Sequence, residues 1–189
     1  MNKNYIFFLF FLIIICVCSC NSKQNPKPKG YFRIDFPQKT YQKYKSKNFS
    51  FNYPKYSYLY NDDKNPNWYY IFTPQNKATI YITYKKIDKN SPLDTLIESS
   101  HEFVYKHTIK ADAITETKYF NDSLRVFGIL YDIKGNTASS LQFFVTDSTK
   151  HFLRGSLYFE CSPNKDSLAP VIDFFREDIV KLMETFSWE

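Results

Sequence analysis

Glycine is scarce in this sequence, which contains four glycines in 189 residues. Loops that cradle phosphate groups depend on glycine, because the backbone must come close to the ligand. The sequence has neither a P-loop nor a G-x-G-x-x-G pattern, so it gives no indication of nucleotide binding. Aromatic residues, in contrast, make up 20% of the chain, a share that favours a β-rich core.

Histidine is equally scarce, and the three histidines show no metal-binding pattern. His101 and His107 are six positions apart, about 240° around a helix, so their rings cannot share a metal ion. Glu98 and His101 have half of the spacing of a carboxylate-bridged metal motif, but no second copy exists. We expect His101 to be a rim or core histidine bonded to a neighbouring carboxylate, and we expect no metal or other cofactor.

A nucleophile with the surroundings of a hydrolase is also lacking. Residues 147–151 (DSTKH) place an acid, a hydroxyl and an imidazole together. The members of a catalytic triad converge from separate elements, however, and no G-x-S-x-G elbow accompanies this segment. Asp147 and Ser148 are more simply explained as turn residues that bond their own backbone. The sequence therefore predicts no enzyme, with a hydrolase that uses Ser148 or His151 as the alternative.

Cysteine occurs at four positions, and three of them alternate near the N-terminus: Cys16, Cys18 and Cys20. A zinc site would need a second pair of cysteines, whereas Cys161 stands alone in the rest of the chain. Residues 5–17 form an uncharged apolar run. The run is shorter than the about 20 residues of a membrane span and is typical of the core of a signal peptide.

Residues 17–20 (VCSC) match a bacterial lipobox, in which the thiol of the last cysteine accepts diacylglycerol before cleavage on its N-terminal side. We therefore expect cleavage between Ser19 and Cys20, with an uncleaved helical anchor as the alternative. Cys20 would then carry lipid, so Cys161 would have no disulfide partner. We expect Cys161 to be a buried structural thiol.

The lipobox divides the chain into three predicted parts. These are a signal peptide over residues 1–19, the lipidated cysteine with a Pro/Lys-rich tether over residues 20–30, and a single domain over residues 31–189. Two or three acyl chains hold a protein on a bilayer almost irreversibly. Asn21, not an aspartate, follows the cysteine, and we therefore expect an outer-membrane location facing the periplasm.

The positive charge of the chain does not indicate a nucleic-acid partner. The net charge is +6, but the lysines are scattered among Tyr, Asn and Phe residues and form no compact patch. One cation, Arg154, lies in the middle of an apolar stretch. We expect it to be either an exposed charge on an edge strand or the partner of a buried carboxylate such as Asp132 or Glu160.

Alternating residues, as in 49–53 and 78–84, and apolar runs, as in 68–73, predict a succession of short strands. They are expected over residues 49–53, 68–73, 78–84, 113–120, 124–133, 138–146 and 151–160, with residues 56–60 pairing with the first strand. A helix is expected over residues 93–106, capped by Ser91 and opened by Pro92. A C-terminal helix is expected from the apolar stripe of Val171, Phe175, Ile179, Leu182 and Phe186.

This order of elements predicts an α+β fold, in which helices flank an antiparallel β-sheet. The opening strand FSFNYP (residues 49–54) and a closing helix that ends in ETF (residues 184–186) also resemble the PsbP/Mog1-type α/β/α sandwich.

Several short segments after the lipobox are informative in combination. They are KPKGYFRID at residues 27–35, GNTAS at 135–139, TDS at 146–148, HFLRG at 151–155, LYF at 157–159 and DSL at 166–168. Together these segments resemble the gliding-motility lipoprotein GldD family of the Bacteroidetes. The resemblance implies a membrane-anchored lipoprotein that gliding motility and the associated type IX secretion system require, with protein partners in that machinery. It implies no enzymatic activity, cofactor or small-molecule substrate, and it transfers a chemical role to Cys20 alone. The alternative function is a periplasmic module that binds a lipid or glycan in an aromatic-lined cleft.

Overall fold

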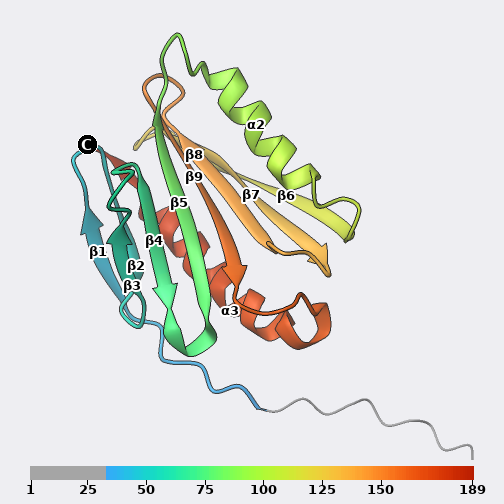
Figure 1. Ribbon diagram of the computed structural model, residues 1–189. Helices are drawn as coiled ribbons and strands as arrows, with labels where there is room; N and C mark the ends of the chain where they lie inside the picture. Colours follow the sequence, from blue (N-terminus) through green and yellow to red (C-terminus); the bar gives the residue numbers. More distant parts are fainter. Residues whose placement is uncertain (1–32) are drawn as a thin grey trace, which may run out of the picture. The chain divides into compact units, whose positions relative to one another are not determined.

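The computed structural model describes residues 33–189 of the chain (Figure 1). The predicted signal peptide, the cleavage site between Ser19 and Cys20, the lipidation site and the tether over residues 20–30 lie outside the described residues. Ile34–Glu189 forms one compact unit.

The main sheet of this unit has seven strands, and every neighbouring pair is antiparallel. The spatial order is β3-β4-β5-β9-β8-β7-β6, so β9 lies between β5 and β8 (Figure 1). The strands are β3 (Tyr58–Asn61), β4 (Trp68–Thr73), β5 (Ala78–Lys86), β6 (Ala111–Asn121), β7 (Val126–Gly135), β8 (Leu141–Thr146) and β9 (His151–Phe159).

The pleat of these strands sends alternate side chains to opposite faces of the sheet. In β5, Ile80 and Ile82 are buried on one face, whereas Tyr81 between them is exposed on the other. The strands predicted between residues 68 and 160 are confirmed, although β8 begins at Leu141 rather than at residue 138. A 3-10 turn, η1 (Pro74–Asn76), joins β4 to β5.

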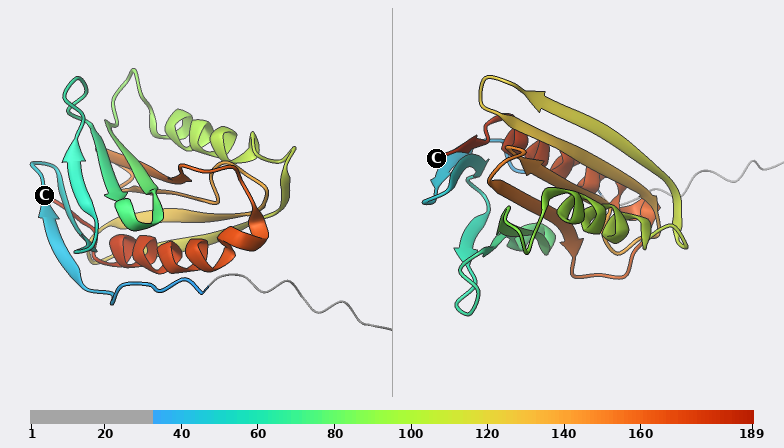
Figure 2. Two further views of the ribbon diagram at one scale, coloured as in Figure 1. Left: turned by 60° about the horizontal axis from the view of Figure 1, so that its bottom comes forward. Right: turned by 90° about the horizontal axis from the view of Figure 1, so that it is seen from above.

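Two helices cover opposite faces of the main sheet (Figure 2). The longer one, α3 (Lys165–Glu184), packs its apolar stripe into the larger core, where the predicted residues are buried: Val171, Phe175, Ile179 and Leu182. The shorter one, α2 (Leu93–Tyr105), packs Leu96 and Val104 against a second cluster that includes Phe144 and Phe152 of the sheet. The predicted α+β class is confirmed, and its layers form an α/β/α sandwich.

A three-stranded sheet extends the larger core beyond the end of α3. It consists of β1 (Tyr41–Lys45), β2 (Phe49–Pro54) and β10 (Ser187–Trp188) in the order β1-β2-β10. The ring of Phe186 stacks on Phe49 and Phe51, with centroid distances of 5.7 and 6.1 Å. The last residues of the chain are therefore fixed against its first strands.

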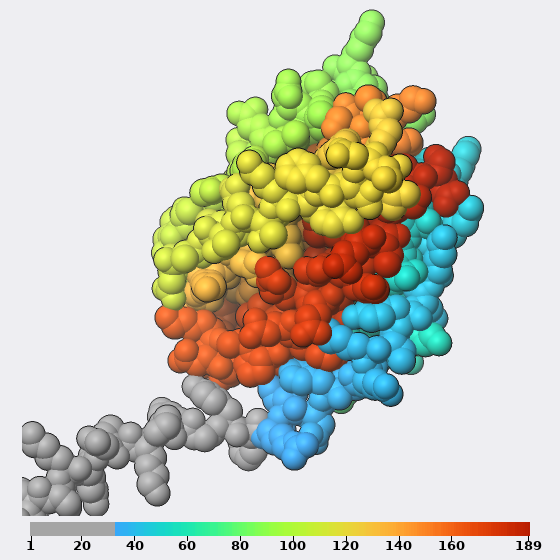
Figure 3. All heavy atoms as spheres, turned by 180° about the vertical axis from the view of Figure 1, so that it is seen from behind, coloured from blue at the N-terminus to red at the C-terminus, as the bar shows by residue number. Residues whose placement is uncertain are grey.

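The segment before β1 lies along α3, as the view from behind shows (Figure 3). Lys39 in this segment donates a hydrogen bond of 2.9 Å to Asp178 on α3. The ring of Phe36 stacks on that of Phe174, also on α3, with a centroid distance of 4.4 Å. These contacts join residues that are far apart in the sequence.

Three predictions of local structure were wrong. Residues 56–60 do not pair with β2, because β3 lines up with β4 and places Tyr60 opposite Tyr70. Ser91 does not cap α2: it forms an isolated bridge with Asp88, and the helix begins after Pro92 without a side-chain cap. Cys161 is exposed, because it follows the end of β9 in the loop that leads to α3.

Candidate functional site

The sheet face that α2 partly covers carries a row of tyrosines. We call Tyr60, Tyr70, Tyr81 and Tyr158, on β3, β4, β5 and β9, the tyrosine row. Successive ring centroids along the row are 5.2, 5.3 and 5.5 Å apart. The row arises because Tyr60, Tyr70 and Tyr81 stand at paired register positions, and Tyr158 lies diagonally across from Tyr81.

The rings of the tyrosine row are held in place yet open to a partner. The exposed fractions of Tyr60, Tyr81 and Tyr158 are 49%, 45% and 37%. The hydroxyl of Tyr70 donates a hydrogen bond of 2.9 Å to Oδ2 of Asp62. Burial, and then this bond to a carboxylate, raises the pKa of Tyr70. Stacking of Tyr60 on Tyr70 and edge-to-face packing of the other two pairs fix the rings further.

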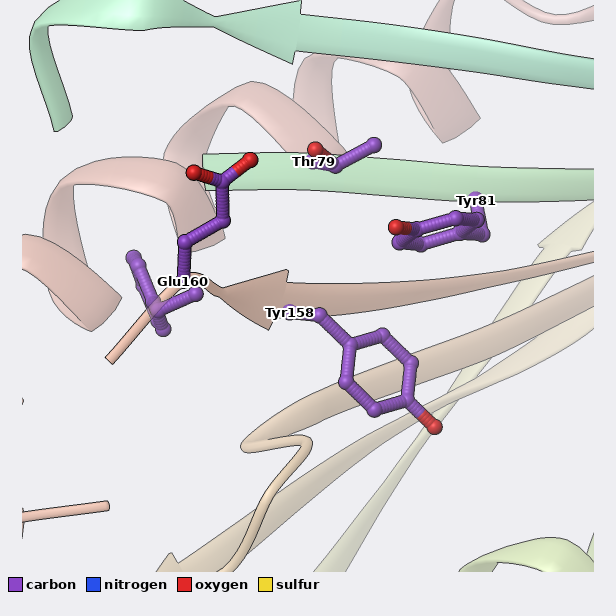
Figure 4. Close-up of a pocket in the computed structure, with 5 residues that line it drawn as sticks. Thr79, Tyr81, Tyr158 and Glu160 are labelled. Carbon is purple, nitrogen blue, oxygen red and sulfur yellow. The ribbon is translucent and has the colours of Figure 1, made fainter. Parts of the chain in front are cut away.

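One end of the tyrosine row borders a pocket of about 420 Å³. Its lining includes Tyr81, Tyr158, Thr79 and Glu160 (Figure 4). In Figure 4 the carboxylate of Glu160 and the hydroxyl of Thr79 lie toward one end, and the two rings toward the other. The site therefore offers aromatic surface together with one acidic acceptor. Such a surface suits a protein segment or a polar small molecule.

Arg154 reaches the same face but takes neither of its predicted roles. It lies on β9, which is a central strand and not an edge. Its guanidinium lies 4.1 Å from the ring centroid of Phe103 on α2. Among residues 33–189 it forms no ion pair. Asp132 instead binds Arg176 of α3, with Nε–Oδ1 and Nη2–Oδ2 distances of 2.9 and 3.1 Å.

Two of the three histidines, His101 and His151, contact polar side chains of the fold. Nδ1 of His101 lies 3.9 Å from Oε1 of Glu116, so the predicted carboxylate is a neighbour but lies beyond hydrogen-bond distance. Its Nε2 lies 3.2 Å from the hydroxyl of Tyr131. Burial lowers the pKa of His107. Within the described part of the chain, no three potential metal ligands of the His, Cys, Asp or Glu type gather at one place.

The turn at residues 147–151 has the predicted capping geometry. Oδ1 of Asp147 accepts hydrogen bonds from the backbone N–H groups of Thr149, Lys150 and His151, at 3.0, 2.8 and 2.8 Å. Burial would raise the pKa of Asp147, but these donors hold it below its usual value. The imidazole of His151 faces elsewhere, with Nδ1 2.7 Å from the hydroxyl of Tyr84. Asp147 is thus a turn residue and does not orient His151 as a triad acid would.

The family model described as gliding motility lipoprotein GldD matches residues 21–188 of the chain. The chain belongs to this family. As a GldD family member, it is a lipoprotein of gliding motility, a role that implies membrane anchoring and protein partners. No helix within residues 33–189 has the length and apolar character to cross a membrane.

This GldD family member was also compared with curated proteins and with solved structures. None of the curated proteins compared matches it. Among solved structures it is similar to the solution structure of cyanobacterial PsbP (CyanoP) from Synechocystis sp. PCC 6803. The identity is 13%, the alignment covers 86% of this chain and 98% of that chain, and the TM-score is 0.49.

The tyrosine row was missed by sequence reasoning, although each of its members was placed on or near a predicted strand. Tyrosines at positions of the predicted strands that point away from the core were the sign in the sequence that could have indicated the row. The sequence does not give the order of the strands, however, and β5 pairs with β9 much later in the chain, with Tyr81 opposite Ser156. The predicted lipidation site, Cys20, and the predicted cleavage site between Ser19 and Cys20 lie outside the described residues.

Proposed function

We propose that this protein is a non-enzymatic, membrane-anchored component or assembly factor of the gliding motility and type IX secretion machinery. Lipid on Cys20 would hold it at the outer membrane, with Ile34–Glu189 facing the periplasm. The observation that carries the proposal is the family match over residues 21–188. The capping role of Asp147 also supports a non-enzymatic role, because it leaves the most enzyme-like segment of the sequence with a structural explanation.

Within this proposal, the tyrosine row is the face that binds a partner protein. Tyrosine is enriched in protein interfaces, since its ring gives a large contact area and its hydroxyl gives a hydrogen bond. The row presents its rings already packed against one another, so little side-chain freedom is lost on binding. A tether to the bilayer would also favour binding, because it raises the effective concentration of the protein near partners in the same envelope.

A lipid- or glycan-binding module is the second candidate function. The pocket of about 420 Å³ beside Tyr81 and Tyr158 favours it, since small-molecule sites range from about 300 to 1,000 Å³. Native mass spectrometry of the protein purified from its own envelope separates the two functions. A retained lipid or glycan supports the module, whereas a ligand-free protein with cross-linked partners supports the machinery component.

Deleting the coding gene is expected to abolish colony spreading and to block export of type IX cargo. Restoring the wild-type gene tests the assignment, and normal spreading and secretion in the deletion strain would refute it.

Complementation with altered chains then tests the tyrosine row. A chain with Tyr81→Ala and Tyr158→Ala is expected to fail to restore spreading, because loss of each buried interface aromatic costs about 1–3 kcal/mol of binding. The control is Phe120→Ala on the distant strand β6, where the side chain is 67% exposed. Equal protein levels must be shown by immunoblot. Full spreading with the double variant would place the partner-binding face elsewhere.

A further inference from the structure

A second pocket on the same sheet face lies between α2 and the strands. Its volume is about 230 Å³. Its walls are apolar where they are formed by Phe103 and Leu96 of α2, Phe152 of β9 and Trp68 of β4. Two cations, Lys85 and Arg154, also line it, and no carboxylate does. The pocket thus combines apolar walls with two positive charges.

Arg154 is the unusual group in this pocket. It is half-buried on a central strand, between Thr83 of β5 and Phe144 of β8. Burial lowers the pKa of its guanidinium, although the group stays charged at any physiological pH. A charge that is withdrawn from water without a counterion is costly. Other withdrawn charges of the described residues have partners: Asp178 binds Lys39, and Asp132 binds Arg176.

The contact with Phe103 explains only part of the environment of Arg154. A cation over an aromatic ring gains attraction from the ring face. The N–H donors of a guanidinium lie in its own plane, however, so a stacked guanidinium can still bind a carboxylate through two parallel hydrogen bonds. Lys85 adds a second positive charge to the same pocket. The nearby acids of α2, Asp94, Glu98 and Glu102, do not line it.

We propose that this pocket binds a carboxylate attached to an apolar group of about the size of one aromatic ring. Arg154 would bind the carboxylate, Lys85 would add long-range attraction, and Phe103, Leu96 and Phe152 would contact the apolar group. The volume limits the ligand, because about 230 Å³ is below the usual range of drug-sized sites, about 300–1,000 Å³. The carboxylate could belong to a free aromatic acid or to the C-terminal residue of another protein. The inference goes beyond the proposed function and does not depend on it.

Binding of phenylacetate to the purified full chain in detergent tests the site. Trp68 lines the pocket, so tryptophan fluorescence reports occupancy, and calorimetry gives the affinity. Saturable binding is expected, and phenylacetamide, which has the same shape without the charge, is expected to bind at least about tenfold more weakly. Equal affinity for phenylacetate and phenylacetamide would overturn the proposal, as would the absence of saturable binding of both phenylacetate and the acid peptide described below.

Variants assign the binding to the two cations. Arg154→Met keeps an unbranched apolar stem beside Phe103 but removes the guanidinium, and it is expected to weaken phenylacetate binding at least about tenfold. Lys85→Gln is expected to weaken it several-fold, whereas Lys86→Gln, an exposed neighbour outside the pocket, is expected to leave it unchanged. Unchanged affinity in a folded Arg154→Met variant would overturn the proposal. If that variant does not fold, Lys85→Gln and the phenylacetamide comparison decide.

Binding of a short peptide distinguishes the two sources of the carboxylate, a free aromatic acid and the C-terminal residue of another protein. The tripeptide Ala-Ala-Phe with a free carboxylate is compared with its C-terminal amide. Tighter binding of the acid peptide than of phenylacetate supports the site with a protein chain end as occupant. Binding of phenylacetate without binding of the peptide supports it with a free small acid. Equal binding of the acid peptide and its amide would count against the site.

Discussion

Replacing Asp178 by alanine is expected to lower the free energy of unfolding by about 3–5 kcal/mol, the range for breaking a buried ion pair. The side chain of Asp178 is 1% exposed. Its Oδ1 accepts hydrogen bonds from Nζ of Lys39 and the hydroxyl of Tyr41, both at 2.9 Å. Its Oδ2 accepts a third from the hydroxyl of Tyr56. Alanine would leave two hydroxyls without their acceptor, and it would leave the ammonium group of Lys39 with only the backbone oxygen of Phe174 and the exposed carboxylate of Glu177, at 3.3 Å.

The effect should extend beyond the polar groups themselves. Nζ of Lys39 also donates to the backbone oxygen of Phe174 at 2.6 Å and lies 4.0 Å from the centroid of its ring. Burial, and then the bond to Asp178, raises the pKa values of Tyr41 and Tyr56. The network therefore fixes both β1 and the segment before it on α3. Without the carboxylate, this edge of the larger core is expected to open first.

Urea unfolding followed by circular dichroism measures the change. The matched control is Asp173→Ala, which removes an exposed carboxylate from the same helix and is expected to change the stability by less than about 0.5 kcal/mol. Asp178→Asn keeps the size of the side chain and part of its acceptor capacity, so an intermediate loss is expected. Superimposable unfolding curves for Asp178→Ala and Asp173→Ala would show that the network does not stabilise the fold.

Local pattern was sufficient to predict most elements of the fold. The alternation in residues 78–84 arises because Ile80 and Ile82 enter the core and the intervening Tyr81 does not. The stripe of α3 is visible in sequence because one helix face must be apolar to cover a sheet. In both cases the residues that face the core are the apolar ones, so the buried face can be deduced from the spacing of apolar residues in the sequence.

Polar partners could not be predicted in the same way. Asp178 falls on the apolar stripe of α3, four positions after Phe174 and four before Leu182, and this position was an available sign of a buried acid. Its main partner, Lys39, is 139 positions away, and nothing in the local pattern of either residue names the other. Periodicity shows which face is buried, not which charges meet there.

The partner of Arg154 could not be predicted from local pattern either. Its position within an apolar strand left two roles open, an exposed edge charge or the partner of a buried carboxylate, and the strand order excludes the first. Since β9 lies between β5 and β8, Arg154 cannot be an edge charge. Asp132 does not bind Arg154, because it binds Arg176 of α3. The tyrosine row and the pocket beside Arg154 are both products of this crossover, which no local pattern specifies.

If lipid on Cys20 holds the protein at the outer membrane, as we propose, Cys20→Ala is expected to remove it from that membrane completely and to abolish complementation of spreading. In the proposed processing, lipid attachment needs the thiol of Cys20, and the peptidase that removes the signal peptide acts after that attachment. The variant is therefore expected to carry no lipid and to keep residues 1–19. Each acyl methylene in a bilayer contributes about 0.8 kcal/mol, so two or three chains exceed any other membrane contact available to the protein. The described residues contain no helix that could replace them.

Labelling with a radioactive fatty acid, mass analysis of the N-terminus and membrane fractionation measure the outcome. Cys18→Ala is the matched control, because it changes a neighbouring cysteine and leaves the lipid acceptor in place. A second variant replaces residues 1–20 by a secretory signal without a lipobox, and it is expected in the soluble periplasmic fraction. If that soluble form restored spreading, the anchor would be dispensable for function. Fatty-acid label on Cys20→Ala would show instead that another cysteine is the acceptor, and the division of the chain at residue 20 would be wrong.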